Sequence, residues 1–544
     1  MKIRIPNHIT IYRENQPPMN FVETDCCEEE GVTVQLLQNA RGIAVQVCST
    51  AAPLCYVRLR WNYTDEEMPK EAVKVLGDAW ERGYGDLEWR GIVPDRFMPW
   101  YAVVSNGSDA VQDYQGRHTE CFGVGVQPNA MCFWQHDTCG VTLWMDLRNG
   151  GEGVQLNGRT LEAATVIFKD YWNISAFDAV CRFCKEMSPL PLCINHPVYG
   201  ANNWYYAYGS SSHEEILKDS QIIKALSKDA DNCPYMVIDD GWQPNLTDAP
   251  WDVGNARFPD MKRLAQQMRD IGVRPGIWIR YLRDEKRQAK GVKSEWRMMR
   301  DEEFLDPSHP EVLEYVADTT KRLVQEWGYE LIKHDFSTYD IFGKWGYQIR
   351  EQITPDGWHF FDRTKTSAEI VLGFYRTILE SAGNALILGC NCISHLCAGL
   401  VHLNRVGDDT SGISWSRTKK MGVNTLAFRL PQDGAFYRAD ADCVGIKPNA
   451  IAWEKNKIWM QLLADSGTPA FLSIEPAALN SENKGDILQA MKIASCQRNR
   501  VRPLDWMENC YPEVWLKNDT EICRFHWMDE WGEGRFAPGE EMLV

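Results

Sequence analysis

The chain lacks the features that direct a protein to a membrane or to nucleic acid. No apolar run approaches the ~20 residues that a helix needs to cross a bilayer, and no Lys/Arg-rich run is present. The formal net charge is -17 at pH 7. Because nucleic acids and anionic membranes attract basic surfaces, this charge argues against both as partners. A neutral or cationic small ligand suits such a surface better.

The amino terminus also has little that resembles an export signal. Residues 1–16 carry early positive charge, but they contain no apolar core segment and no small-residue cleavage site. The 18 cysteines of this 544-residue chain are therefore better explained as reduced thiols than as a disulfide framework. These observations predict a cytoplasmic protein.

Residues 1–190 contain short segments of alternating polar and apolar residues, broken by Gly, Asn and Asp. This spacing is typical of an antiparallel β-sandwich. Helical patterns are few, with candidates at 71–82 and 176–187. We find no group of catalytic side chains in this region. The clearest strand candidates lie at 31–38, 42–49, 55–63, 130–137 and 140–147.

The pattern changes after the segment 188–200, which contains several Pro residues and a Gly. Apolar strand candidates now alternate with amphipathic helices, which indicates parallel β/α units. Eight strands can be counted, and eight is the number that closes a barrel. They begin at Asn203, Tyr235, Arg274, Glu330, Ala385, His402, Gly434 and Thr468.

The predicted fold class is therefore α/β, with three parts. Residues 1–190 form an N-terminal β-sandwich, and residues 191–497 form a (β/α)8 TIM barrel. Residues 498–544 contain strand-like runs at 513–518 and 521–527. This last part is too short for a full sandwich, so we predict a short C-terminal β segment.

Charged and aromatic side chains gather at the carboxyl ends of the predicted barrel strands. The segment 330–336 leads into Lys333 and Asp335, and such a pair is either a buried ion pair that sets register or part of a catalytic site. Strand ends of a barrel meet on one face, and carboxylates with aromatic rings around a pit are typical of a sugar site. The other candidates are Trp204, Tyr206, Asp239, Asp240, Trp242, Arg280, Cys390, Asn391, Arg405, Asp408 and Asp409.

Six motifs in this region resemble, in order and spacing, the α-galactosidases of glycoside hydrolase family 36, which are related to family 27 and to plant raffinose synthases. The resemblance implies a barrel between a β-sandwich and a smaller β-domain. It implies that Asp335 is the nucleophile and Asp409 the acid/base. It also implies sugar contacts from Asp239, Asp240, Lys333 and Arg405. The motifs lie at 203–209, 238–243, 257–261, 272–278, 331–335 and 405–409.

A retaining glycosidase needs one ionised carboxylate to attack and one protonated acid to release the leaving oxygen. Lys333 lies two residues before Asp335 on a strand, so both face the same side and the lysine should lower the carboxyl pKa. Enclosure by apolar walls would raise the pKa of Asp409. The adjacent Asp408 is an alternative acid/base, and the motif register favours Asp409.

Two further groups of residues have a simpler interpretation. The set Cys390, Cys392, His395, Cys397 and His402 could suggest zinc, yet its spacing is not that of a usual finger and the resembled family needs no metal. We interpret these cysteines as buried thiols, and we expect no metal and no cofactor. Trp278 and Trp459 are interpreted as core residues.

The hypothesis is a retaining, exo-acting α-galactosidase that acts on small oligosaccharides or glycosides. Trp204, Trp242, Cys390, Asn391 and Asp408 are expected to contact substrate. Asn391 follows strand five where relatives face the second carbon of the sugar, so preference for a 2-hydroxyl or a 2-acetamido group stays open. A raffinose-synthase-like transglycosylase, an α-N-acetylgalactosaminidase and a non-catalytic sugar-binding relative are the alternatives. Association into a homo-oligomer stays open.

Overall fold

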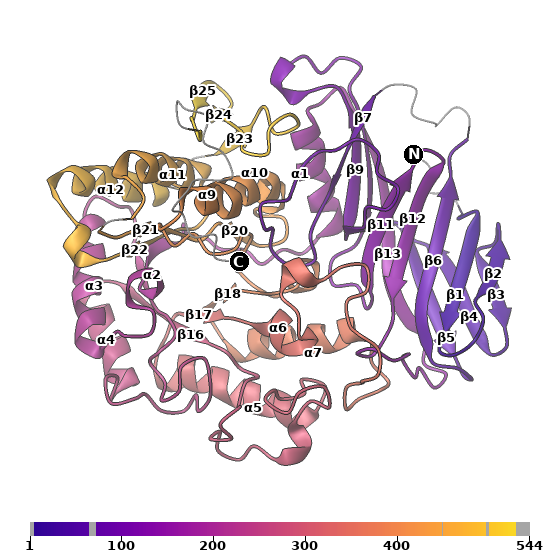
Figure 1. Cartoon of the computed structure of the whole chain (residues 1–544), viewed down its shortest axis with the longest axis horizontal. Helices are drawn as coiled ribbons and strands as arrows, with labels where there is room; N and C mark the ends of the chain where they lie inside the picture. Colours follow the sequence, from indigo (N-terminus) through magenta and orange to yellow (C-terminus); the bar gives the residue numbers. More distant parts are fainter. Residues whose placement is uncertain (1–4, 65–71, 449, 497–499, 529–544) are drawn as a thin grey trace.

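The computed structural model describes residues 5–64, 72–448, 450–496 and 500–528. Within them the chain forms an N-terminal β-sandwich, a parallel barrel beside it and a small C-terminal sheet (Figure 1). The predicted fold class is confirmed. The C-terminal sheet comprises β23 (Val501–Pro503), β24 (Val514–Lys517) and β25 (Glu521–Arg524).

The sandwich consists of two antiparallel sheets whose inner faces are apolar. Trp61 and Trp134 of the first sheet pack on Phe168 of the second, with ring centroids 5.0 and 5.8 Å apart. The first sheet has the order β2 (Met19–Val22), β1 (His8–Arg13), β6 (Leu54–Asn62), β12 (Gly140–Asp146), β11 (Met131–Asp137) and β8 (Met98–Pro99). The second has the order β3 (Cys26–Glu29), β4 (Val32–Gln38), β5 (Ile43–Ser49), β13 (Leu161–Trp172), β10 (His118–Val124), β9 (Tyr101–Asn106) and β7 (Val73–Gly77).

Of the two helices predicted in this region, one is observed and the other is not. The helix predicted at 176–187 is α1 (Ala176–Met187), with Ser175 as its N-cap. The helix predicted at 71–82 is wrong, because Val73–Gly77 is the strand β7, which pairs with β9; Glu71 lies outside the described residues. Val73 and Val75 favour a strand when an edge is available for pairing, and that partner is not visible in the local sequence.

The barrel is a parallel sheet with the order β20 (Arg438–Asp440), β19 (Leu403–Arg405), β18 (Leu386–Gly389), β17 (Leu331–His334), β16 (Arg274–Ile279), β15 (Tyr235–Ile238), β14 (Tyr199–Asn202), β22 (Ala470–Ile474) and β21 (Cys443–Ile446). The predicted seventh strand is split. Its first half, β20, pairs with β19, and its second half, β21, pairs with β22. The two halves are separated by Ala441 and Asp442, whose φ of 71° turns the chain between them. This broken strand closes the ring.

Helices surround the strands of the barrel (Figure 1). The amphipathic patterns at 213–228 and 450–467 form α3 and α11. The helices after α1 are α2 (Trp204–Ala207), α3 (His213–Leu226), α4 (Met261–Ile271), α5 (Pro310–Lys321), α6 (Ser337–Phe342), α7 (Ser367–Ser381), α8 (Ser394–Cys397), α9 (Trp415–Thr418), α10 (Thr425–Arg429), α11 (Trp453–Ser466) and α12 (Ser481–Ala494).

The first barrel strand begins earlier than predicted. We expected it to start at Asn203, but β14 ends at Asn202 and the aromatic run that follows is the short helix α2. The Asn203 side chain accepts a hydrogen bond of 2.8 Å from the backbone N–H of Asp239. The strand therefore ends at Asn202, because the side chain of Asn203 bonds to the segment after β15. The β propensity of the Trp and Tyr residues that follow is not sufficient to continue the strand.

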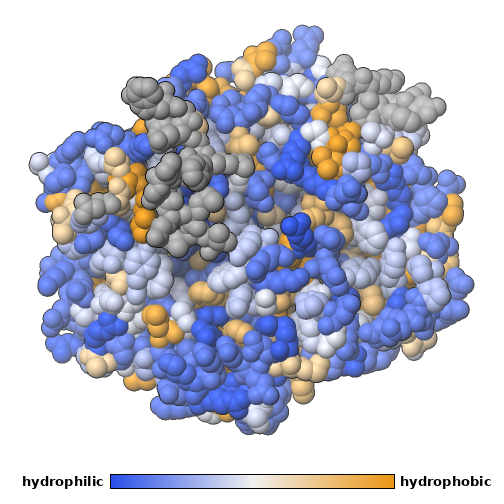
Figure 2. Space-filling model, in the orientation of Figure 1, coloured by the Kyte–Doolittle hydropathy of each residue, from blue (hydrophilic) through white to orange (hydrophobic). Residues whose placement is uncertain are grey.

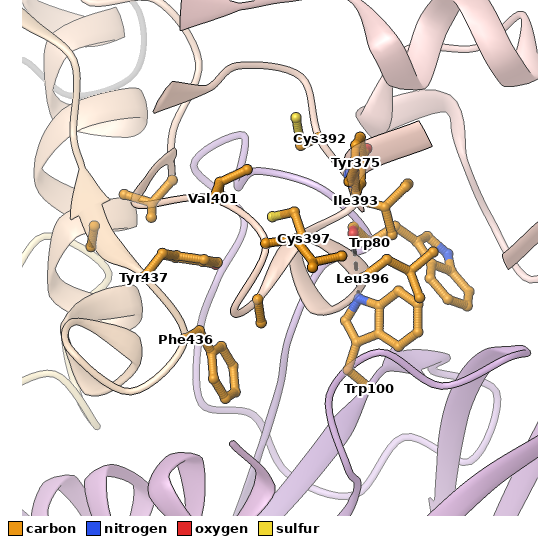
Figure 3. Close-up of a cluster of buried hydrophobic side chains, with 14 of the residues drawn as sticks. Trp80, Trp100, Tyr375, Cys392, Ile393, Leu396, Cys397, Val401, Phe436 and Tyr437 are labelled. Carbon is orange, nitrogen blue, oxygen red and sulfur yellow. Dashed lines mark hydrogen bonds between the residues drawn. The ribbon is translucent and has the colours of Figure 1, made fainter. Parts of the chain in front are cut away.

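An apolar cluster joins the sandwich to the barrel (Figure 3). Trp80 and Trp100 come from the sandwich side, and the Trp100 indole N–H donates to the Trp80 carbonyl at 3.3 Å. The barrel contributes Leu396 and Phe436, and the buried His395 ring stacks on Trp100 at 5.1 Å between centroids. The two parts therefore share a continuous core.

None of the described helices is long and apolar enough to span a bilayer. The face shown in Figure 2 is mainly hydrophilic, with hydrophobic residues in small scattered groups.

Trp100→Ala should destabilise the protein by about 3–5 kcal/mol, because it opens a cavity in this shared core. Trp172→Ala is the matched control, because Trp172 is exposed on the same sandwich. Thermal unfolding should show a large fall in Tm for the first variant and a small one for the second. Equal falls in Tm for the two variants would contradict the role assigned to the apolar cluster between the sandwich and the barrel.

Candidate active site

A cavity of about 290 Å³ lies at the carboxyl ends of the barrel strands. It brings together side chains from six strand ends or the loops after them, and two from the sandwich. Barrel enzymes place their active sites on this face. The lining residues are Arg82, Tyr84, Trp204, Asp239, Asp240, Thr247, Trp278, Lys333, Asp335, Phe336, Trp345, Tyr347, Asn391, Asp408, Asp409 and Arg417.

Asp335 lies directly after β17 and accepts three hydrogen bonds. The donors are the Trp278 indole N–H at 3.0 Å, the Phe336 backbone N–H at 2.7 Å and the Asn391 side-chain amide. Burial by itself would raise the pKa of Asp335, but the charge of Lys333 and the bonds from Trp278 and Asn391 outweigh it and lower that pKa. The expected effect of Lys333 is present, and the carboxylate is held ionised.

Lys333 is buried, and its ammonium pairs with Asp239 at 2.7 Å. The Asn202 amide donates to the same Asp239 oxygen at 2.7 Å. Asp240, the next residue, accepts from the Gln243 amide at 2.6 Å through Oδ1, whereas its buried Oδ2 has no hydrogen-bond partner among the described residues. Burial raises the pKa of Asp240 to about 6. A polar group of this kind is suited to receive a ligand hydroxyl.

Asp408 and Asp409 both line the cavity after β19, but their environments differ. Arg82 contacts Asp408 Oδ1 at 2.7 Å and Arg417 contacts Oδ2 at 2.5 Å, so both oxygens are engaged. Asp409 is paired with Arg405 at 3.0 Å through Oδ1. The Asp409 side chain is 40% exposed and that of Asp408 is 17% exposed. Asp409 is therefore the more accessible carboxyl.

The predicted rise in the pKa of Asp409 is wrong. Burial acts in that direction, but Arg405, Arg82 and Lys333 outweigh it and lower the pKa to about 2. The apolar enclosure that we expected is replaced by three cations. The motif 405–409 already contains Arg405, whose charge is the largest of those that lower this pKa, whereas Arg82 and Lys333 come from other segments.

Three predicted contact residues lie behind the cavity wall. Trp242 is fully buried and donates its indole N–H to the Trp278 carbonyl at 2.9 Å. Cys390 is buried and receives a weak contact from the Arg405 guanidinium at 3.8 Å. Arg405 itself is buried, and it bridges Asp409 and Asp442, each at 3.0 Å. Their side chains support the lining residues.

Two other candidates also point elsewhere. Arg280 is buried in an ion pair with Asp340 at 2.6 Å, and the Tyr206 hydroxyl donates to Asp219. Trp278 is buried, as the core interpretation predicted, and it also forms part of the cavity wall, where its indole N–H meets Asp335. Trp459 is buried as expected. Strand alternation alone does not separate inward from outward side chains when the first residue of a strand is uncertain.

Sequence reasoning missed the contribution of the sandwich to this site. Arg82 and Tyr84 reach the cavity on the loop after β7, and the Gly83 N–H donates to the Val406 carbonyl at 2.8 Å. This loop was predicted as a helix in a region without catalytic residues. No local pattern marks it, since its position is set by the docking of two domains. The other missed lining residues are Thr247, Phe336, Trp345, Tyr347 and Arg417.

The cysteines considered as zinc ligands lie apart from the cavity lining. Cys392 and Cys397 belong to the interdomain cluster (Figure 3). His395 donates to the Val124 carbonyl at 2.8 Å, and burial lowers its pKa to about 4. These residues pack in the core or bond to backbone groups, as expected for buried thiols and a core histidine.

No protein-family model matches the chain, but solved structures share its fold. The α-galactosidase TtGalA of Thermus thermophilus, in complex with p-nitrophenyl α-D-galactopyranoside, aligns with a TM-score of 0.59 and 16% identity over 95% of this chain and 98% of that chain. A variant of the glycoside hydrolase family 36 α-galactosidase AgaA of Geobacillus stearothermophilus, in complex with stachyose, aligns with a TM-score of 0.59 and 14% identity over 94% and 76%. The galactosidase domain of the α-galactosidase–sucrose kinase AgaSK aligns with a TM-score of 0.58 and 16% identity over 93% and 74%.

These alignments establish that the chain is similar in fold to family 36 α-galactosidases. They span almost the full length of the chain, so the sandwich is included as well as the barrel. The predicted resemblance and the observed fold therefore agree.

Lys333→Met should destabilise the protein by about 3–5 kcal/mol, because it leaves the buried Asp239 carboxylate without its counter-charge. The double variant Lys333→Met/Asp239→Asn should recover part of this loss, since neither charge remains. Lys365→Met, which breaks an exposed pair with Asp362 at 3.1 Å, is the control and should cost no more than about 1 kcal/mol. Additive effects of the two buried substitutions in chemical unfolding would refute the coupling.

Proposed function

We propose that this protein is a retaining, exo-acting α-galactosidase, which hydrolyses terminal α-galactosides of small oligosaccharides or glycosides. The observation that carries the proposal is the presence in one barrel cavity of two carboxylates with different environments, Asp335 and Asp409. The fold shared with family 36 α-galactosidases and the six motifs support the assignment. The expected substrate is a small sugar, and neighbours of this fold were solved with stachyose and p-nitrophenyl galactoside.

Asp335 has the properties of a nucleophile. Its three hydrogen-bond donors and the charge of Lys333 favour the ionised carboxylate. In the proposed first step Asp335 bonds to the anomeric carbon of the galactoside while the bond to the leaving oxygen breaks, and that oxygen takes the proton of Asp409. In the second step water attacks the same carbon, gives its proton to Asp409 and releases Asp335.

Asp409 must be protonated in the first step, although the neighbouring cations lower its pKa. A bound sugar displaces water from the carboxyl, which disfavours the charged form, and the negative charge of Asp335 acts in the same direction. When Asp335 becomes an ester, its charge is lost and the pKa of Asp409 falls again. The same group then suits the role of base. Both oxygens of Asp408 are held by Arg82 and Arg417, so this carboxyl is less free to reach a leaving oxygen.

The remaining lining residues suit the recognition of a sugar. Asp239 and Asp240 are proposed to accept hydroxyls, and the Asp240 Oδ2 atom lacks a hydrogen-bond partner among the described residues. Asn391 Oδ1 is also buried and has no hydrogen-bond partner among the described residues, which supports the proposed contact near the second carbon of the sugar. Trp204 offers an apolar ring face.

Transfer of galactose to another sugar is a second candidate function. Tyr84, Trp345 and Tyr347 line the same cavity, and Tyr84 and Tyr347 are in contact at 5.2 Å between ring centroids. Aromatic faces of this kind can hold a leaving sugar or an acceptor sugar. Product analysis with an excess of sucrose separates transfer from hydrolysis.

We also propose a cytoplasmic location, which the 18 free cysteines support. Cell fractionation with an antibody against the protein tests this. Recovery of the native protein outside the cytoplasm would refute it.

Asp335→Ala should abolish release of nitrophenol from p-nitrophenyl α-galactoside without loss of folding, because it removes the attacking group. Asp409→Ala should slow the reaction by about 10²–10⁴-fold, the usual contribution of a general acid. Asp356→Ala, at an exposed aspartate, is the control and should keep full activity. The α-N-acetylgalactosaminide and the α-glucoside are assayed in parallel to define the sugar.

NMR of the first product tests the stereochemistry. Retention of the α configuration is expected, and release of β-galactose would exclude the covalent mechanism. Full activity of Asp335→Ala would exclude the assigned nucleophile.

Arg82→Gln should move the pH profile of kcat/KM to higher pH. The Arg82 charge lowers the pKa of both Asp335 and Asp409, so its removal should raise both and shift the acid and basic limbs together. Initial rates across a pH series give the two limbs. A uniform fall in rate with an unchanged profile would indicate that Arg82 only supports the fold.

A further inference from the structure

Asp442 is a buried carboxylate that the proposed reaction does not use. It lies in the break of the seventh barrel strand, between β20 and β21, and its φ is 71°. The residue is 3% exposed and does not line the active-site cavity. A left-handed backbone at a residue other than glycine costs free energy, and such residues are concentrated at functional sites. The contacts of the Asp442 side chain indicate what this position does.

The Asp442 carboxylate holds the segment that carries Asp409. Arg405 Nη1 contacts Asp442 Oδ1 at 3.0 Å, and Nη2 of the same guanidinium contacts Asp409 Oδ1 at 3.0 Å. Thr410 is the residue after Asp409. Its backbone N–H donates to Asp442 Oδ2 at 2.7 Å, and its hydroxyl donates to the same oxygen at 3.0 Å. Asp442 therefore fixes the acid/base through the cation that both carboxylates share and through the next peptide unit.

Tyr205, on the short helix α2, connects the same two carboxyls. Its hydroxyl donates to Asp442 Oδ2. A bond from this hydroxyl is also one of the causes that lower the pKa of Asp409. The contacts of Asp409 thus come from the segments after three different barrel strands, β14, β19 and β20.

Asp442 also changes the charge that acts on Asp409. Arg405 is the strongest of the cations that lower the pKa of Asp409. Asp442 neutralises part of the Arg405 charge from behind, as does the buried Asp440 beside it. A nearby negative charge disfavours a second one, so Asp442 favours the protonated form of Asp409. The other charged or titratable groups around Asp409 are Arg82, Lys333, Arg417, Tyr205, Tyr208, Asp335 and Asp408.

We propose that Asp442 is a positioning residue for Asp409, which it aims at the leaving oxygen by holding Thr410 and by sharing Arg405. This inference rests on the function proposed for the active site, because it assigns to Asp409 the role of acid/base. Asp442 does not touch the substrate, so its effect on the reaction passes through Asp409 alone.

The first test is the pH profile of kcat/KM for p-nitrophenyl α-galactoside. Asp442→Asn keeps an acceptor oxygen for Thr410 but loses the negative charge beside Arg405. The pKa of Asp409 should therefore fall, and the basic limb should move to lower pH by about one unit. Tyr205→Phe removes only a hydroxyl that stabilises ionised Asp409, so the basic limb should move to higher pH. Shifts in the same direction, or no shift in either variant, would overturn the proposal.

Asp109→Asn is the matched control. Asp109 is buried in the sandwich, pairs with Arg117 at 3.1 Å and accepts the backbone N–H groups of Ala176 and Phe177 at 2.9 and 3.0 Å. This substitution removes contacts of the same kind outside the cavity lining. Stability should fall, and the pH profile should stay that of wild type.

The second test compares leaving groups. Dinitrophenolate leaves without a proton, whereas the sugar oxygen of raffinose needs one from the general acid. Asp442→Asn should lower kcat/KM for raffinose at least about tenfold and leave kcat/KM for dinitrophenyl α-galactoside nearly unchanged. An equal loss on both substrates would assign Asp442 to the fold alone.

A third measurement needs no turnover. Asp409→Asn and Asp442→Asn each leave the buried Arg405 one of the two carboxylates that contact it, and the double variant removes both. The loss of unfolding free energy in the double variant should therefore exceed the sum of the two single losses. Additive losses in chemical unfolding would overturn the inference. Absence of turnover in wild type on every α-galactoside would instead refute the proposed function, and the unfolding measurement would still decide whether Asp442 and Asp409 are coupled.

Discussion

The buried ion pair between Lys333 and Asp239 is the interaction on which the cavity depends. It joins the ends of β17 and β15 across β16, at 2.7 Å, inside the barrel. Two charges in such a place are costly unless each is paired and hydrogen-bonded, and the Asn202 amide supplies a further bond to Asp239. The same ammonium lowers the pKa of Asp335. One lysine therefore holds two strand ends together and also keeps the proposed nucleophile ionised.

A second requirement is the contact between the sandwich and the barrel. The apolar cluster around Trp80 and Trp100 fixes the loop after β7, and this loop then places Arg82 over the ends of the strands. Gly83 sits close to the barrel, where an added Cβ would lie 2.9 Å from Thr425 Cγ2. The interface is therefore part of the site, because Arg82 holds Asp408 and changes the charge around Asp409. A barrel alone would lack this cation.

The tryptophans connect the floor of the site to the outer loops. Trp242, Trp251 and Trp278 are buried and in mutual contact, with centroid distances of 6.1 Å from Trp251 to each of the other two. The three indole N–H groups differ in their hydrogen bonding. That of Trp278 meets Asp335, that of Trp242 meets a backbone carbonyl, and that of Trp251 has no acceptor among the described residues. Aromatic packing thus supports the wall of the cavity.

The sequence by itself determined the order of the parts, five strands of the sandwich, most strands of the barrel and the strand ends that carry Asp239, Lys333, Asp335 and Asp409. These features follow from local periodicity and from motifs whose residues are close in the chain. It did not determine the start of β14, the broken seventh strand or the edge pairing of β7, because each depends on a distant partner. Tertiary structure alone decided that Arg82 enters the cavity, that Trp242 leaves it, and that the pKa of Asp409 is lowered. The physical reason is that burial and charge are set by neighbours in space, and some of these neighbours come from distant segments, as Arg82 does for Asp409.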